Sequence, residues 1–213
     1  MSSVNRAVEV KLPEAEVLAD LYGIVFDLDA ATYLCEKAVE QGQPRRHDSL
    51  LVEGLVAAAV VRYGRCFSTG ARSGLRRQDI AKLNADDLAT HNYFKDLRDK
   101  FVAHSVNPFE VTYVTTTTRE RDGTKCPIRS VGAGQHRLLL SADTAEALAH
   151  LISMVKAIVQ VRVSAEKQRL LEVIQALPLE TIHSGDLHTP RPLKASDVGK
   201  SRKQTSRSNP ARP

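Results

Sequence analysis

Apolar residues recur every three or four positions over most of the chain, and in one stretch this period is lost. The spacing predicts helices over residues 14–40, 48–67, 84–105 and 141–177. The middle of the second segment is apolar on most sides, so this helix should be central. The fourth, at about 35 residues, should project beyond a compact bundle or break near Val163.

Residues 109–140 follow a different pattern. They begin with β-branched and aromatic residues, and Asp122-Gly123 is typical of a hairpin turn. We expect a β-hairpin or a partly ordered insertion, with residues 137–140 as a returning strand and 132–134 as a flexible kink. The glycines at 132 and 134 lack the flanking strand and helix of a phosphate-binding loop, which argues against one.

Together these patterns predict an all-α fold, a four-helix bundle with a small β-hairpin insertion between the third and fourth helices. The expected organisation is an N-terminal extension (1–13), a helical domain (14–183, with its insertion at 109–140) and a basic, disordered tail (184–213). A short turn is expected over 78–83, between the second and third helices.

Charge is distributed unevenly along the 213 residues. The net charge is +5, and residues 184–213 hold seven basic and two acidic residues, so this tail carries the whole excess. Such a tail can bind polyanions loosely through counterion release, although a solvated terminus is the simpler interpretation. Residues 1–183 are neutral overall, which does not favour a strongly basic folded face.

Cysteine usage and hydropathy favour a cytoplasmic protein without a membrane span. Cys35, Cys66 and Cys126 are widely spaced and lack metal-ligand spacing, so free thiols are expected and neither a metal nor a cofactor is predicted. The longest apolar run, residues 55–61, is far shorter than the ~20 residues that a membrane span needs.

One segment of the third predicted helix could carry chemistry. A helical wheel shows an apolar stripe made of Phe94, Leu97, Phe101 and His104. His104 lies at one edge of this stripe and Arg98 at the opposite edge. Histidine can exchange a proton near neutral pH, and arginine can hold a phosphate and stabilise the charge of a transition state. RNA supplies its own 2′-hydroxyl nucleophile, so this pair would suffice for phosphodiester cleavage without metal. The structural alternative is a core histidine and a surface arginine.

The run 97–105, Leu-Arg-Asp-Lys-Phe-Val-Ala-His-Ser, resembles the signature of HEPN domains. Those domains carry an arginine, a polar residue and then a histidine four to six residues beyond the arginine. Here Asp99 follows Arg98, and five residues separate Arg98 from His104. The form of the run is most similar to the HEPN group associated with abortive-infection and toxin systems.

The resemblance implies a homodimer in which both copies of the motif line one cleft, and metal-independent endoribonuclease activity. Arg98 would then hold the phosphate, His104 would transfer protons and Asp99 would orient one of them. The implied partners are RNA, a second copy of the chain and a possible antitoxin protein. Nucleic-acid contacts are expected from Arg76, Arg77, Lys95 and Ser105.

Two other hypotheses remain open. The chain could be a non-catalytic dimerisation or regulatory module on the same fold, or an RNA-binding protein that acts through its basic tail. Val106 stands where some HEPN proteins carry a modified tyrosine, so that antitoxin arrangement is not supported. His91 is expected on the polar side of the third helix.

Overall fold

The computed structural model describes residues 9–10, 12–43, 48–68, 72–102, 110–118, 120–121, 123–125, 130–178, 180 and 195. The basic tail predicted over 184–213 lies outside this part of the chain, apart from residue 195. So do Cys126, His104, Ser105 and most of the predicted N-terminal extension.

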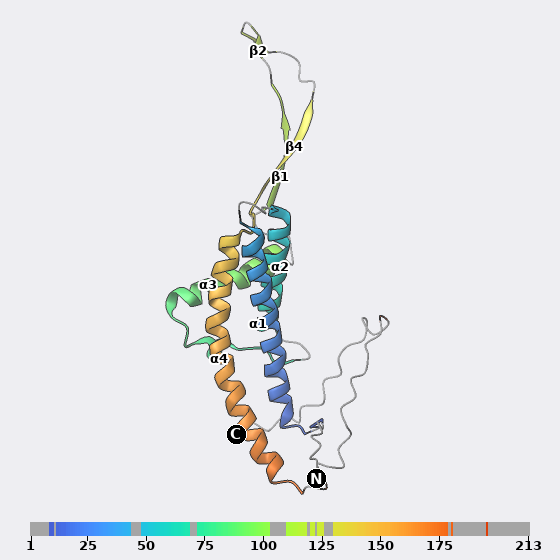
Figure 1. Ribbon diagram of the computed structural model, residues 1–213. Helices are drawn as coiled ribbons and strands as arrows, with labels where there is room; N and C mark the ends of the chain where they lie inside the picture. Colours follow the sequence, from blue (N-terminus) through green and yellow to red (C-terminus); the bar gives the residue numbers. More distant parts are fainter. Residues whose placement is uncertain are drawn as a thin grey trace, which may run out of the picture.

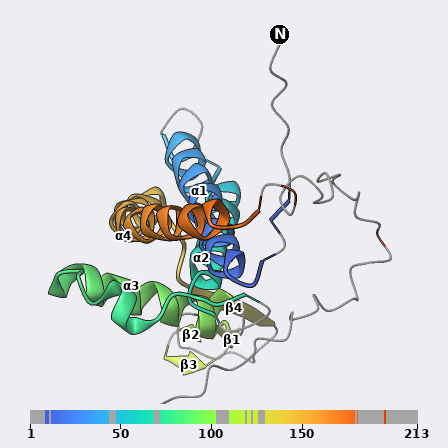
Figure 2. The same ribbon diagram turned by 90° about the horizontal axis from the view of Figure 1, so that it is seen from below.

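The described chain is mostly helical, as predicted. Three helices, α1 (Ala15–Gln41), α2 (Ser49–Arg65) and α4 (Ala142–Gln175), pack side by side, and α1 and α4 run antiparallel (Figure 1). The shorter helix α3 (Ala85–Leu97) lies across them in both views (Figures 1 and 2). The predicted turn before α3 is a 3₁₀ helix, η1 (Arg77–Ile80).

Side chains that accept hydrogen bonds from the first turn define where three of the helices begin. Asp48 accepts from the backbone N–H of Leu51 at 3.0 Å, and Asn84 accepts from that of Asp87 at 2.8 Å. Ser141 caps α4 in the same way. Such caps satisfy N–H groups that lack a partner within the helix, so the starts predicted at 48, 84 and 141 agree closely with the structure.

The core lies between α1, α2 and α4 and consists of aliphatic residues with few aromatics. Burying a leucine or valine side chain contributes ~1.5–3 kcal/mol, so this layer supplies most of the stabilisation. Cys35 and Cys66 are free thiols within it, and burial raises the pKa of each to about 12. The fully enclosed residues include Leu28, Val56, Val60, Leu148, Leu151, Ile152 and Val155.

The third helix does not continue as a regular α-helix through the motif. It ends at Leu97, and Arg98–Val102 form a π-helical turn, η2. A π turn holds more residues than an α turn, so side chains beyond Leu97 do not follow the 100° wheel. Phe94 and Leu97 are buried as predicted, whereas Phe101 is only half-buried.

The insertion forms a two-stranded arm that projects from one end of the bundle (Figure 1). Strand β1 (Glu110–Thr116) pairs antiparallel with β4 (Val131–Arg137), so the prediction of a returning strand at 137–140 was wrong. Gly132 and Gly134 lie inside regular β4 and do not form a kink. Nearer the tip, β2 (Glu120–Arg121) pairs with β3 (Thr124–Lys125), and Gly123 has φ 73° at the predicted turn.

An ion pair ties the base of the arm to the bundle. Arg137 Nη2 lies 3.0 Å from Glu53 Oε2 on α2, and Arg137 Nη1 donates to Glu53 Oε1 at 3.2 Å. The arm is otherwise exposed along both strands. It therefore adds little to the bundle core.

Helix α4 is long and apolar enough to cross a membrane by length and composition. About a third of its apolar window is buried inside the fold. Leu148, Leu151 and Val155 of this helix pack in the bundle core. The fold is therefore compatible with a soluble protein.

Candidate functional site

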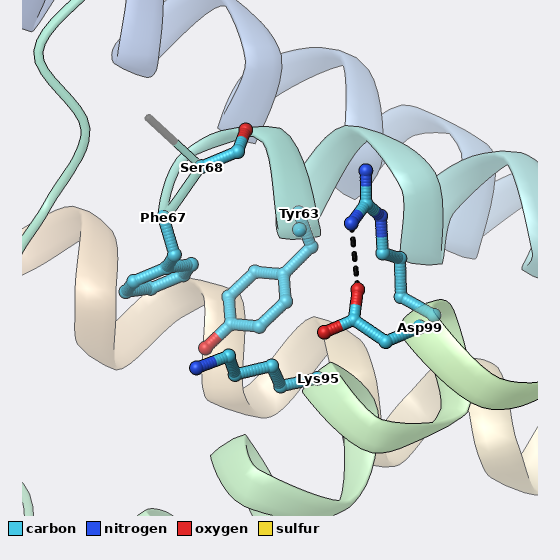
Figure 3. Close-up of a pocket in the computed structure, with 7 residues that line it drawn as sticks. Tyr63, Phe67, Ser68, Lys95 and Asp99 are labelled. Carbon is cyan, nitrogen blue, oxygen red and sulfur yellow. Dashed lines mark hydrogen bonds and ion pairs between the residues drawn. The ribbon is translucent and has the colours of Figure 1, made fainter. Parts of the chain in front are cut away.

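A small open pocket lies where the end of α2 meets α3 and η2 (Figure 3). Its volume is about 100 Å³. Pockets that enclose whole small molecules measure ~300–1,000 Å³, so this one suits a single chemical group of a larger ligand. The lining residues are Tyr63, Gly64, Phe67, Ser68, Lys95, Arg98 and Asp99.

The sequence motif supplies the charged side of this pocket. Arg98 Nη1 donates to Asp99 Oδ1 at 2.6 Å, the contact marked in Figure 3. The two side chains are 35% and 42% exposed, so the pair is accessible to solvent. Because Asp99 holds one edge of the guanidinium, the orientation of Arg98 is restricted while its other N–H groups remain able to donate.

Gly64 of α2 lies directly beneath the Arg98 side chain. A Cβ atom at Gly64 would stand 3.0 Å from Arg98 Cγ and 3.3 Å from Cδ. The aliphatic stem of Arg98 therefore rests on bare helix backbone, where most other residues would displace it. This contact places the guanidinium over the last turns of α2.

Behind the pocket lies a cluster of rings, in which Tyr63 and His91 are buried and Phe67 is partly buried. Tyr63 Oη and His91 Nδ1 are 2.8 Å apart, and the Phe67 ring lies 4.5 Å from the imidazole, centroid to centroid. The expectation that His91 faces solvent was wrong, because its side chain is buried against α2. A helical wheel cannot reveal that a neighbouring helix carries a partner for a polar side chain.

Burial keeps both members of this pair neutral at pH 7. It lowers the pKa of His91, with a smaller contribution from the positive charge of Lys95, and it raises the pKa of Tyr63. The charged groups of the pocket are therefore Lys95, Arg98 and Asp99, which together carry one net positive charge. The arrangement suits a singly charged anion such as a phosphodiester.

The other predicted site residues do not all join the pocket. Lys95 lines it, whereas Arg76 and Arg77 are exposed at η1 and are not part of its lining. The Arg76 backbone N–H donates to Asp79 Oδ2 at 2.6 Å, which anchors the start of η1. His104 and Ser105 lie outside the described residues.

The described apolar residues of the third helix pack within the chain itself. Phe94 and Leu97 are each 1% exposed and belong to the core of a single chain. They cannot also be the surface through which two copies pair. Any dimer contact must therefore use other residues.

Sequence reasoning missed the contribution of α2. Tyr63 and Phe67 are spaced to share one helix face, and their rings lie 5.1 Å apart. That spacing was a detectable signal, but it did not show that the third helix would cross at this point. Gly64 and Ser68 carried no signal, since both join the pocket only where α3 and η2 pack against the end of α2.

Among the residues that the structure describes, no group of three histidine, cysteine, aspartate or glutamate side chains is placed to hold a metal ion. Comparisons with protein-family models, with curated proteins and with solved structures found no match.

Proposed function

We propose that this protein is a metal-independent endoribonuclease of HEPN type, acting as a toxin or phage-defence effector. The observation that carries the proposal is the placement of Arg98. Its side chain is 35% exposed at a small cationic pocket, and Asp99 holds the guanidinium at 2.6 Å. A fixed arginine fork of this kind is suited to a phosphate and to the charge that develops there during cleavage.

The reaction uses the 2′-hydroxyl of RNA as the nucleophile. The 2′-oxygen bonds to the adjacent phosphorus and the bond to the 5′-oxygen breaks, which leaves a 2′,3′-cyclic phosphate and a free 5′-hydroxyl. His104 takes the proton from the 2′-hydroxyl, and a second copy of His104 in a homodimer cleft protonates the leaving oxygen. Arg98 holds the non-bridging oxygens throughout.

The size of the pocket agrees with a polymeric substrate. At about 100 Å³ it can admit a phosphate while the rest of the strand lies across the surface. Lys95 adds a second positive charge at its edge. The ring of Phe67 offers an apolar face for a neighbouring base.

Cleavage of a mixed RNA substrate in EDTA tests the proposal. Arg98→Ala and His104→Ala should each abolish cleavage while the helical content and melting temperature stay near those of the wild type. Arg169→Ala on α4, an arginine of similar exposure (44%), is the matched control and should cleave normally. Wild-type products should end in cyclic phosphate, and the absence of cleavage by folded wild-type protein would contradict the proposal.

One observation favours a second candidate, a non-catalytic dimerisation or regulatory module. Asp99 already neutralises much of the charge of Arg98, as it would in a purely structural ion pair. Under this hypothesis Arg98→Ala changes oligomeric state or stability, and the wild type has no cleavage to lose. Sedimentation of both proteins, run beside the cleavage assay, separates the two candidates.

A further inference from the structure

Three arginines converge on one buried carboxylate beside the candidate site. Asp27 of α1 is 4% exposed, and Arg62 Nη1 and Arg72 Nη2 lie 2.9 and 2.7 Å from its two oxygens. Arg65 Nε makes a longer contact of 3.5 Å with the same group. We call Arg62, Arg65 and Arg72 the arginine patch.

The patch holds more positive charge than the single negative charge of Asp27 can neutralise. Burial by itself raises the pKa of Asp27. Hydrogen bonds from Arg72 and Arg62 and the charge of Arg65 lower that pKa by more, so the net pKa is lowered and Asp27 is ionised. Asp20 lies two turns before Asp27 on the same face of α1, and it accepts from the backbone N–H of Ser73 at 2.8 Å. Even if Asp20 is counted, three guanidinium groups face two carboxylates.

The surplus charge is accessible to solvent. The side chain of Arg72 is mostly buried, at 17% exposed, and forms an ion pair with Asp27. The side chains of Arg62 and Arg65 are 45% and 50% exposed. They present donors to solvent from a fixed position, because Asp27 restricts their rotamers. Their charge also exceeds the half-unit of negative charge at the end of α2.

The patch and the pocket share the last turns of α2. Ser68, which lines the pocket, donates through Oγ to the carbonyl oxygen of Arg65 at 3.0 Å. Gly64, the residue before Arg65, carries the stem of Arg98. Ser68 follows the end of α2 by three residues, and both it and Arg65 are exposed, so this hydrogen bond places the two residues next to each other where the helix ends.

We propose that the arginine patch binds a second phosphate of the RNA strand whose scissile phosphate lies at Arg98. The inference rests on the proposed ribonuclease function for the identity of the strand. A strand that leaves the pocket past Ser68 meets Arg65 and then Arg62 along α2. The ligand is the repeating phosphodiester of RNA, recognised by charge and without sequence preference.

Binding of a fluorescent 12-nucleotide single-stranded RNA tests this, measured by anisotropy over a series of KCl concentrations. The full chain is used, with His104→Ala in every sample to prevent cleavage. Arg62→Gln/Arg65→Gln should weaken binding about tenfold at low salt. The slope of log affinity against log salt should become shallower by about 0.7, the value for the one phosphate that the variant no longer neutralises.

Controls separate charge from folding. Arg62→Lys/Arg65→Lys keeps the charge and should retain most of the affinity, and Arg169→Gln should bind like the parent. Arg72 is left in place to hold Asp27. If the double variant melts early, Arg65→Gln alone is used, since its contact with Asp27 is the longest of the three.

The outcomes distinguish the inference from the proposed function. Unchanged affinity and salt slope in Arg62→Gln/Arg65→Gln would overturn the inference, whether or not the wild type cleaves RNA. Loss of affinity together with absence of wild-type cleavage would support the patch as an RNA site and contradict the ribonuclease. Inorganic phosphate or a mononucleotide could instead displace the RNA at concentrations as low as those at which RNA itself binds. That result would overturn the assignment of the patch to the RNA backbone in favour of a small-anion site.

Discussion

Gly64 and Arg98 lie in direct contact, so that a Cβ atom at position 64 would stand 3.0 Å from Arg98 Cγ. The side chain of Arg98 thus packs directly against the backbone of Gly64. Gly64 sits inside α2, where glycine costs ~0.5–1 kcal/mol relative to alanine. The chain keeps a residue that weakens the helix at the position where Arg98 needs space.

Gly64→Ala should therefore separate activity from stability. The new methyl group pushes the Arg98 stem away from the pocket, and a displacement of about 1 Å can lower cleavage by up to ~100-fold. The free energy of unfolding should stay level or rise, because alanine favours the helix. RNA cleavage and urea unfolding are the two measurements.

Gly54→Ala is the matched control for this change. Gly54 also lies in α2, and a Cβ there meets no atom within 4 Å. Cleavage should be unchanged and stability should rise by ~0.5–1 kcal/mol. Equal cleavage by the two variants would show that the contact between Gly64 and Arg98 does not matter for activity.

Tyr63→Phe should destabilise the fold without changing its shape. The change removes the hydroxyl that lies 2.8 Å from His91 Nδ1 and leaves a buried ring nitrogen without its partner. An unsatisfied buried polar group costs ~1–3 kcal/mol, which urea unfolding at pH 7.5 would detect. A variant as stable as the wild type would mean that water replaces the hydroxyl.

The stability of the protein should fall in mild acid because of His91. Burial lowers its pKa in the folded state, so the ring is neutral in both states above the unfolded value of ~6.5. As pH falls through that value, the unfolded chain binds a proton that the folded chain does not. Stability is therefore lost towards the lowered pKa and then levels off.

His91→Gln tests this acid sensitivity. The glutamine amide can still hydrogen-bond to Tyr63 and does not titrate. Between pH 7.5 and 5 the wild type should lose more free energy of unfolding than the variant. Parallel curves for the two proteins would exclude His91 as the source.

The projecting arm should respond to Gly134→Ala independently of the bundle. Gly134 faces Tyr113 across the strand pair, and a Cβ there would lie 2.6 Å from the tyrosine Cζ. The ring must swing away from its stacked position on His136, where the two centroids are 4.8 Å apart. Amide exchange in β1 should quicken while the melting temperature of the bundle stays constant, because the arm is exposed.

Gly132→Ala is the control on the same strand. Its Cβ would meet only Thr115 Oγ1, at 3.2 Å, so the hairpin should tolerate it better. An unchanged contact between the rings of Tyr113 and His136 by NMR in Gly134→Ala would contradict the prediction. Melting of the whole bundle would show that the arm and the helices unfold together.

The sequence by itself determined where most of the helices lie. Side-chain period and capping residues are local signals, and Asp48, Asn84 and Ser141 mark helix starts because each satisfies N–H groups within a few residues. The turn at Gly123 followed from the same local chemistry. The length of α4 followed from its unbroken apolar stripe.

Only the tertiary structure decided which side chains meet. Asp27 falls on the apolar side of α1, and its partners Arg62 and Arg72 lie 35 and 45 residues further along the chain. Tyr63 finds His91 because α3 crosses α2, and the π turn at Arg98 moves the motif away from the regular wheel. These pairings arise from burial, which forces each polar group to take whatever partner the packed helices bring near, and no local spacing encodes that choice.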